Sequence, residues 1–211
     1  MAGKFITFEG VEGAGKSTQV RFLATYLRHA GHDVTVTREP GGTPTAEAIR
    51  DVILSGAAKE LGPENEAVLF AAARADHVDK VIRPSLERGG WVLCDRFIDS
   101  TRVYQGAADG VDPQLIRALE RVAVGDTRPD LTFILDLPAD VGMERTAARD
   151  RAPDRFEADE LGRHETRRMA YLEIASREPE RVVVIDASRT PEEIAETIRG
   201  LVDARLLARA A

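Results

Sequence analysis

Gly10-Val11-Glu12-Gly13-Ala14-Gly15-Lys16-Ser17 matches the pattern G-x-x-x-x-G-K-[ST], and it lies between a β-rich run, 5–9, and an amphipathic stretch. In such a loop the glycines let successive backbone N–H groups point at phosphate oxygens, and the following helix adds the positive end of its dipole. We expect that helix to begin at Lys16, whose side chain would reach the β- and γ-phosphates, while Ser17 would place its hydroxyl on Mg²⁺. The stretch predicts a nucleoside triphosphate site, with an accidental glycine turn as the alternative.

The rest of the chain predicts the fold around this loop. Five short apolar runs alternate with longer amphipathic stretches, and they cover residues 5–9, 34–38, 91–95, 131–136 and 182–186. This alternation predicts an α/β fold of the P-loop NTPase type: a doubly wound, five-stranded parallel sheet with helices on both faces. Ligands of such sheets bind beyond the carboxyl ends of the strands, where Gly10, Arg38, Asp95 and Asp136 fall.

Capping signals place several helix starts. Asp112-Pro113 and Thr190-Pro191 are typical of an N-cap followed by a first-turn proline, and a helix is expected to begin near Pro63. Asp140 is a candidate N-cap for a further helix.

Composition limits the class of protein. The chain has 211 residues, 43% of them hydrophobic, which predicts one domain over 1–211. A net charge of −7 does not supply the basic face of a nucleic-acid binder, so a mononucleotide is the expected partner rather than a polymer. No leader or bilayer-length apolar run is present, which predicts a cytoplasmic location away from membranes. Cys94 lies in an apolar run and is expected in the core, with a reactive thiol as the alternative.

Charged residues stand at the ends of three predicted strands, at the expected ligand edge. Arg38 is expected to contact the ligand, although a surface ion pair would also explain it. Asp95 and Arg96 suit a metal-linked or base-like carboxylate beside a phosphate clamp, with an exposed ion pair as the alternative. Asp136 is a second candidate for the acidic residue that assists Mg²⁺, and Asp95 is preferred because Arg96 accompanies it.

Two further segments are candidates for substrate contacts. Phe70 and Arg74 are four residues apart and so share a helix face, where they could stack on a base and hydrogen-bond to it. A core phenylalanine and a solvated arginine are the alternative. The polar segment 100–106, which includes Ser100, Thr101, Tyr104 and Gln105, either lines a substrate pocket or forms an ordinary loop.

A basic segment late in the chain predicts a lid over about 144–158. Arginines at 145, 149, 151 and 155 lie in a run crowded with aspartates, where a solvated helix end is the default reading. Phosphoryl transfer, however, spreads negative charge that a lid arginine can stabilise while water is excluded. The phosphate loop contains no arginine, so this segment is the natural source of a catalytic arginine. The four histidines show no metal-ligand spacing, and none is assigned a role.

Taken together, these residues resemble the thymidylate kinase family. The resemblance rests on FEGVEGAGKST, TREPGGT, FAAARADH, DRFIDSTRVYQG and LDLP in this order, and it covers nearly the whole chain. It implies a nucleoside monophosphate kinase that converts dTMP to dTDP with Mg-ATP, a five-stranded parallel sheet with a lid, and a homodimer. The chain resembles the form of the family that has basic residues in the lid.

The resemblance also implies roles for single residues. Glu12 would hold the sugar 3′-hydroxyl, Arg96 and Arg38 the dTMP phosphate, and Tyr104 would crowd the 2′ position. Phe70 would stack on thymine, Arg74 would bind a thymine carbonyl, and Thr101 would lie near the base edge. Arg149 and Arg155 are the candidate catalytic lid arginines, and Glu9 and Asp95 would assist Mg²⁺ largely through water. The nucleotide-binding set is Gly10, Val11, Glu12, Gly13, Ala14, Gly15, Lys16, Ser17 and Thr18.

The implied mechanism is in-line transfer of the γ-phosphoryl group to the dTMP phosphate, with Lys16, Mg²⁺, Arg96 and the lid supplying most of the barrier reduction. Two other functions stay open on the sequence. One is a kinase of the same architecture that acts on another nucleotide or on a nucleoside. The other is a P-loop switch or ATPase that controls a partner.

Overall fold

A five-stranded parallel sheet forms the centre of the molecule. The structure, a computed structural model, describes residues 3–148 and 154–208. The strands are β1 Lys4–Glu9, β2 Val34–Arg38, β3 Trp91–Asp95, β4 Leu131–Asp136 and β5 Val182–Asp186. They lie in the order β2-β3-β1-β4-β5, so that Arg38 is in register with Asp95 at the carboxyl edge. The predicted fold class and all five strands are confirmed, with β1 beginning one residue earlier than expected.

Helices connect the strands. The α-helices are α1 Lys16–His29, α2 Pro44–Leu54, α3 Pro63–His77, α4 Arg83–Glu87, α5 Ile98–Thr101, α6 Pro113–Val124, α7 Ala139–Ala147, α8 Leu161–Arg177 and α9 Pro191–Val202. Within the described residues, segments of 3-10 or π geometry are η1 Ala57–Leu61, η2 Val78–Ile82, η3 Arg102–Ala108 and η4 Asp203–Leu207. None of the described helices combines the length and hydropathy that a membrane span needs.

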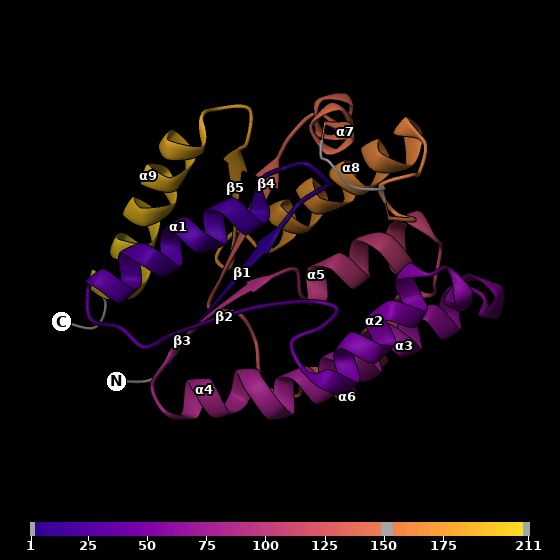
Figure 1. The fold of residues 1–211 in the computed structure, drawn as a ribbon, viewed down its shortest axis with the longest axis horizontal. Coiled ribbons are helices and arrows are strands. Elements are labelled where there is room, and N and C mark those ends of the chain that lie inside the picture. The colour runs from indigo at the N-terminus through magenta and orange to yellow at the C-terminus, as the bar shows by residue number, and fades with distance from the viewer. Residues whose placement is uncertain (1–2, 149–153, 209–211) are drawn as a thin grey trace.

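The central strands β1, β3 and β4 are buried on both faces of the sheet (Figure 1). Ile6 and Phe8 of β1 point toward α1 and α9 and join the largest apolar cluster. Phe5, on the opposite side of the same strand, packs in a second cluster with residues of α3, η2 and α6. This alternation is the two-residue period of a strand, and burial on both sides explains the continuous apolar runs of the sequence. Cys94 is fully buried in the second cluster, as expected.

The capping predictions were right at two helices and wrong at one. Asp112 accepts a hydrogen bond from the backbone of Gln114, and Thr190 forms a capping box with Glu193. Asp140 is not an N-cap, because α7 begins one residue earlier, after Pro138. Its carboxylate accepts from the backbone N–H of Val141 inside the first turn, where negative charge still favours the helix dipole.

Helix α7 approaches the loop between β1 and α1 backbone to backbone. A Cβ atom at Gly142 would lie 2.5 Å from the carbonyl oxygen of Glu12, and a Cβ at Gly13 would clash with the carbonyl of Gly142. Both positions therefore need glycine. The helix that leads into the predicted lid segment is thus seated directly on the phosphate loop.

Gly142→Ala should lower the free energy of unfolding by about 1–3 kcal/mol, because the added methyl group must displace the loop or α7. Urea denaturation would measure the change. Gly200→Ala in α9 is the matched control: its Cβ meets open space, and helix propensity should make it neutral or stabilising by up to about 1 kcal/mol. Equal stability of the two variants would contradict the conclusion that α7 and the phosphate loop lie in backbone contact at Gly142.

Candidate active site

The loop between β1 and α1 has the curled backbone that an anion site requires. Gly10, Gly13 and Gly15 have φ angles of 133°, 76° and 90°, a region that L side chains avoid. The Lys16 ammonium group donates to the carbonyl oxygens of Gly10 at 3.0 Å and Val11 at 2.8 Å. The loop therefore gathers an ammonium group and the positive end of the α1 dipole at one point.

Of the two acidic candidates for metal assistance, Asp95 lies at the phosphate loop. The Ser17 hydroxyl donates to its carboxylate at 2.6 Å. Asp136 instead receives two hydrogen bonds from the Arg168 guanidinium, at 2.7 and 3.1 Å. The preference for Asp95 agrees with this geometry, since it brings two oxygen donors together beside Lys16.

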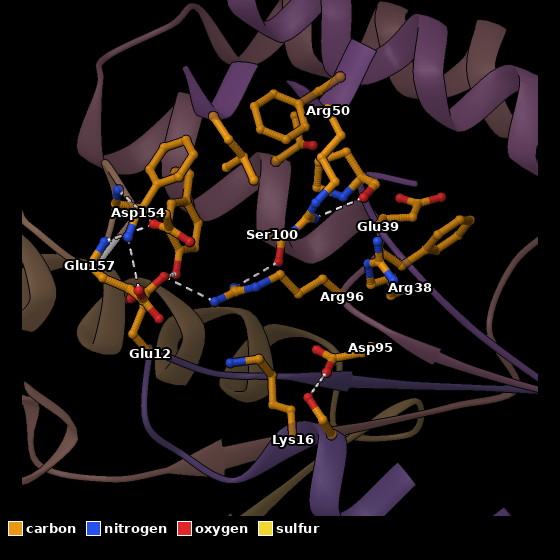
Figure 2. Close-up of a pocket in the computed structure, with 18 of the residues that line it drawn as sticks. Glu12, Lys16, Arg38, Glu39, Arg50, Asp95, Arg96, Ser100, Asp154 and Glu157 are labelled. Atoms are coloured by element: carbon orange, nitrogen blue, oxygen red, sulfur yellow. Dashed lines mark hydrogen bonds and ion pairs between the residues drawn. The ribbon is translucent and has the colours of Figure 1, made fainter. Parts of the chain in front are cut away.

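A cavity of about 290 Å³ opens beside the loop. Figure 2 shows Lys16 and Arg96 near its middle, with Arg38 and Arg50 toward one end and Asp154 at the other. The predicted site residues that line it are Glu12, Gly13, Gly15, Lys16, Ser17, Thr18, Arg38, Phe70, Arg74, Asp95, Arg96, Ser100, Thr101, Tyr104 and Gln105. The predicted residues that do not line it are Glu9, Gly10, Val11, Ala14 and Arg155. Arg149 lies outside the described residues.

Glu12 joins the phosphate loop to the rest of the cavity. Its Oε1 accepts hydrogen bonds from Arg96 at 3.0 Å and from the Tyr104 hydroxyl at 2.5 Å, and its Oε2 lies 3.2 Å from Nδ1 of His164. Burial alone would raise the pKa of Glu12, but His164 and the positive charges of Arg96 and Lys16 outweigh it and hold the pKa well below its usual range. Glu12 is therefore ionised at neutral pH.

Arg96 crosses the cavity in a fixed orientation. It is the one non-glycine among the described residues with a positive φ, 70°, a backbone conformation that costs about 1–2 kcal/mol. Its guanidinium donates to the Ser100 hydroxyl and the Tyr171 hydroxyl, both at 3.2 Å, and also contacts Glu12. These contacts hold a positive charge ready at the centre of the site.

Glu9 binds the residues that follow Arg96 in the chain. It is fully buried, and it accepts from the backbone N–H of Phe97 at 2.7 Å, from Ser100 at 2.7 Å and from the Tyr171 hydroxyl at 3.0 Å. Burial, followed by the charge of Asp99, raises its pKa. Both of its oxygens are engaged by these donors and Glu9 does not line the cavity, so its expected role of assisting Mg²⁺ through water stays a prediction.

Arg74 is held by a buried network. Its guanidinium donates to Glu39 at 2.6 Å, to Thr101 at 3.0 Å and to the carbonyl oxygen of Phe97 at 3.0 Å. The other oxygen of Glu39 lies 3.0 Å from His77. The alternative of a solvated arginine is therefore wrong, since Arg74 is almost completely buried at the cavity wall.

Two arginines lie at the β2 end of the cavity. Arg38 is half-exposed and forms a double hydrogen bond with Glu47, at 2.8 and 3.1 Å. Arg50 of α2 donates to the carbonyl oxygen of Pro40, and burial, followed by the charge of Arg38, lowers its pKa. The ion pair considered for Arg38 exists, and the residue still lines the cavity.

The described part of the lid segment brings Phe156 to the cavity. Its ring centroid lies 5.5 Å from that of Tyr104 and 6.4 Å from that of Phe70. Arg155, by contrast, points to α3, where it pairs with Glu66 at 2.5 Å. Arg155 is therefore engaged with Glu66 and does not line the cavity, and its role as a catalytic lid arginine stays a prediction.

Sequence reasoning missed several side chains of the site. Arg50 and Phe156 line the cavity, and His77, His164 and Tyr171 support it from behind. A single histidine or tyrosine on an amphipathic helix carries no signal of such a role. Phe156 lies within the segment predicted as a lid, but nothing in the sequence indicated that its ring would line the cavity.

Comparison with known proteins supports one family. The chain matches the model of the family described as "Thymidylate kinase" over residues 8–198. It is 55% identical over 207 residues to a thymidylate kinase of Bradyrhizobium diazoefficiens, covering 97% of this chain and 91% of that one. It is 56% identical over 198 residues to one of Nitrobacter winogradskyi, covering 93% and 86%. The crystal structure of thymidylate kinase from Ehrlichia chaffeensis is similar with a TM-score of 0.77 and 34% identity, covering 96% and 99%.

Nucleoside triphosphate binding should weaken above pH 8. Burial, followed by the charge of Arg96, lowers the pKa of Lys16 to about 8, and bound phosphates should raise it again. The free protein above pH 8 must then take up a proton to bind, so the Kd for ATP should be roughly tenfold higher at pH 9 than at pH 7. Calorimetric titrations at both pH values would measure this.

Proton uptake can be checked in two buffers of different ionisation enthalpy at pH 8.5. Lys16→Arg is the matched control, because its guanidinium stays protonated and should remove the pH dependence. Equal affinities of the wild-type protein at pH 7 and pH 9 would show that the Lys16 ammonium is not perturbed as described.

Proposed function

The chain belongs to the thymidylate kinase family, and we propose that it transfers the γ-phosphoryl group of Mg-ATP to dTMP, giving dTDP and ADP. It is an ATP-dependent nucleoside monophosphate kinase. One observation supports the proposal most strongly: a single cavity connects the phosphate loop to a pocket of arginine and aromatic side chains, and Glu12 belongs to both. We propose a single kinase domain over 1–211 with a lid at about 144–158.

For the donor, we propose that residues 10–18 hold the ATP phosphates through backbone N–H groups and Lys16. Ser17 and Asp95 fit Mg²⁺, because they supply neighbouring hydroxyl and carboxylate oxygens, the donors that this ion prefers. No group of three acidic, histidine or cysteine side chains among the described residues could hold a metal alone. Phosphate and water oxygens would complete the shell, and Mg²⁺ would supply charge neutralisation on the transferring group.

For the acceptor phosphate, we propose Arg96 as the main ligand, with Arg38 and Arg50 beside it. All three line the cavity. Arg96 is already oriented by its contacts, so little ordering free energy is lost when a phosphate binds. We expect bidentate contacts, the geometry in which guanidinium groups recognise phosphate.

For the nucleoside, we propose that Phe70 stacks on thymine and that Arg74, with Thr101 and Gln105, reads its edge. Tyr104 would crowd the 2′ position. Glu12 would accept a hydrogen bond from the sugar 3′-hydroxyl, and its Oε2 supports this role: neither Arg96 nor Tyr104 binds this oxygen, and Nδ1 of His164 lies 3.2 Å from it. A carboxylate oxygen can accept more than one hydrogen bond, so a ligand hydroxyl could be a second donor there.

The chemistry needs little from a general base. An oxygen of the dTMP phosphate attacks the γ-phosphorus in line, the bond from that phosphorus to the β-γ bridging oxygen breaks, and ADP leaves. Catalysis then rests on positioning and on positive charge near the transferring group, which Lys16 and Arg96 supply from two sides.

A homodimer and a cytoplasmic location belong to the same proposal. Val52, Leu61, Val68 and Val122 are exposed, Val122 to 83%, on neighbouring segments of the layer formed by α2, η1, α3 and α6. Exposed apolar side chains gathered on one layer support a protein interface there. ATP and dTMP are cytoplasmic metabolites, which supports the location.

Purified protein should release ADP from Mg-ATP strongly with dTMP, weakly with dUMP, and hardly with dCMP or thymidine. The physical reason is that Arg74 is a donor and favours the carbonyl at position 4 of thymine over the amino group of cytosine. A coupled ADP assay with each acceptor separately would test this. Preference for another acceptor would favour a different kinase of this fold. Turnover without acceptor stimulation would favour a switch or ATPase.

Of the two candidate lid arginines, Arg149→Ala should reduce kcat more than Arg155→Ala. Loss of a transition-state arginine costs roughly a thousandfold in related reactions, whereas Arg155 must first leave Glu66 to act. Steady-state kinetics at saturating ATP and dTMP would compare them, with Arg177→Ala, an exposed arginine of α8, as control. A larger kcat loss in Arg155→Ala would reverse the assignment and imply that the pair with Glu66 opens during turnover.

A further inference from the structure

His164 contacts the candidate active site at Glu12. It lies in the first turn of α8, is only 2% exposed, and does not line the cavity. Its Nδ1 lies 3.2 Å from Oε2 of Glu12, the carboxylate oxygen left over after Arg96 and Tyr104 have both bound Oε1. His164 therefore contacts the carboxylate oxygen that neither Arg96 nor Tyr104 binds.

Only one nitrogen of the His164 ring faces Glu12, so the position of the ring proton has to be assigned. Within residues 3–148 and 154–208, Nε2 of His164 is buried without a hydrogen-bond partner, whereas its Nδ1 faces Oε2 of Glu12 at 3.2 Å. A proton on Nδ1 would face the carboxylate and leave Nε2 as an unpaired acceptor, which is less costly than burying an unpaired N–H. This assigns to His164 the tautomer with its proton on Nδ1.

The position of His164 follows from the geometry of α8. His164, Arg167 and Tyr171 are spaced i, i+3 and i+7 and so share a face of the helix. Arg167 lies over the Tyr104 ring at 4.5 Å, and Tyr171 contacts Arg96 and Glu9. One face of α8 thus supports Arg96 and Tyr104, two of the residues that contact the Glu12 carboxylate, and supplies the third, His164.

We propose that His164 is a positioning residue for recognition of the acceptor's 3′-hydroxyl: it fixes Oε2 of Glu12 in the direction from which that hydroxyl binds. The inference rests on the proposed function, because it takes Glu12 as the 3′-hydroxyl ligand. It predicts that loss of the imidazole affects acceptors with a 3′-hydroxyl more than acceptors without one.

Three variants and two acceptors test this. His164→Leu removes the donor, His164→Asn places an amide nitrogen near the position of Nδ1, and His164→Gln places one near Nε2. The acceptors are dTMP and the 2′,3′-dideoxy form of dTMP, and kcat and KM are measured for each at saturating Mg-ATP. His29→Leu, an exposed histidine at the end of α1, controls for loss of an imidazole.

We expect His164→Leu to lower kcat/KM for dTMP roughly tenfold, mainly through KM, and to change that of the dideoxy acceptor by less than about twofold. His164→Asn should restore most of the preference for dTMP, and His164→Gln should restore less. His29→Leu should match the wild-type protein. Since Asn and Gln are both polar, the comparison between them stays informative even if the leucine variant unfolds.

Equal losses for the two acceptors would overturn the proposal and leave His164 with a purely structural role. So would full activity of His164→Leu, or rescue by Gln rather than Asn. If the wild-type protein phosphorylated dTMP without preferring it to the dideoxy acceptor, Glu12 would not read the hydroxyl and the proposal would fall with that role. Absence of any wild-type turnover of dTMP would instead refute the proposed function itself.

Discussion

The buried carboxylate of Glu12 is the interaction on which the rest of the site depends. It lies within the phosphate loop, yet its partners Arg96, Tyr104 and His164 come from three other segments of the chain. A buried carboxylate needs compensating charge and hydrogen bonds, so these segments must converge on it for the fold to be stable. The same convergence brings the donor side and the acceptor side of the reaction into one cavity.

The positive groups of the cavity are held in place by contacts within the protein itself. Lys16 is held by two carbonyl oxygens, Arg74 by Glu39, and Arg96 by a strained backbone and three side chains. Each arrangement costs free energy, because it buries a charge or strains the backbone. The packing of the sheet offsets that cost. Little side-chain entropy is therefore lost when a phosphate binds to these groups. In the proposed function, they would face the negative charge that develops during phosphoryl transfer.

Much of this could be predicted from local sequence. The central strands β1, β3 and β4 end where their apolar runs end, because burial on both faces of a parallel sheet demands continuous apolar residues. The edge strands β2 and β5 leave Val36 and Val184 exposed, and they were recognisable from their short β-rich runs. The phosphate loop was recognisable because Gly13 and Gly15 need positive φ angles and Lys16 follows at a fixed distance. Asp95 could be preferred over Asp136 from its neighbour Arg96, and the contact with Ser17 agrees with that preference.

The sequence by itself determined the fold class, the phosphate loop and most of the residues that line the cavity, because these depend on periodicity and short-range geometry. Tertiary structure alone decided which of them touch. Glu9 accepts a hydrogen bond from the backbone of Phe97, and Arg155 pairs with Glu66. His164 contacts Glu12 from a helix, although it lies 152 positions later in the chain. Such contacts depend on how α3 and α8 pack against the sheet, and a side chain's direction across that distance leaves no local pattern.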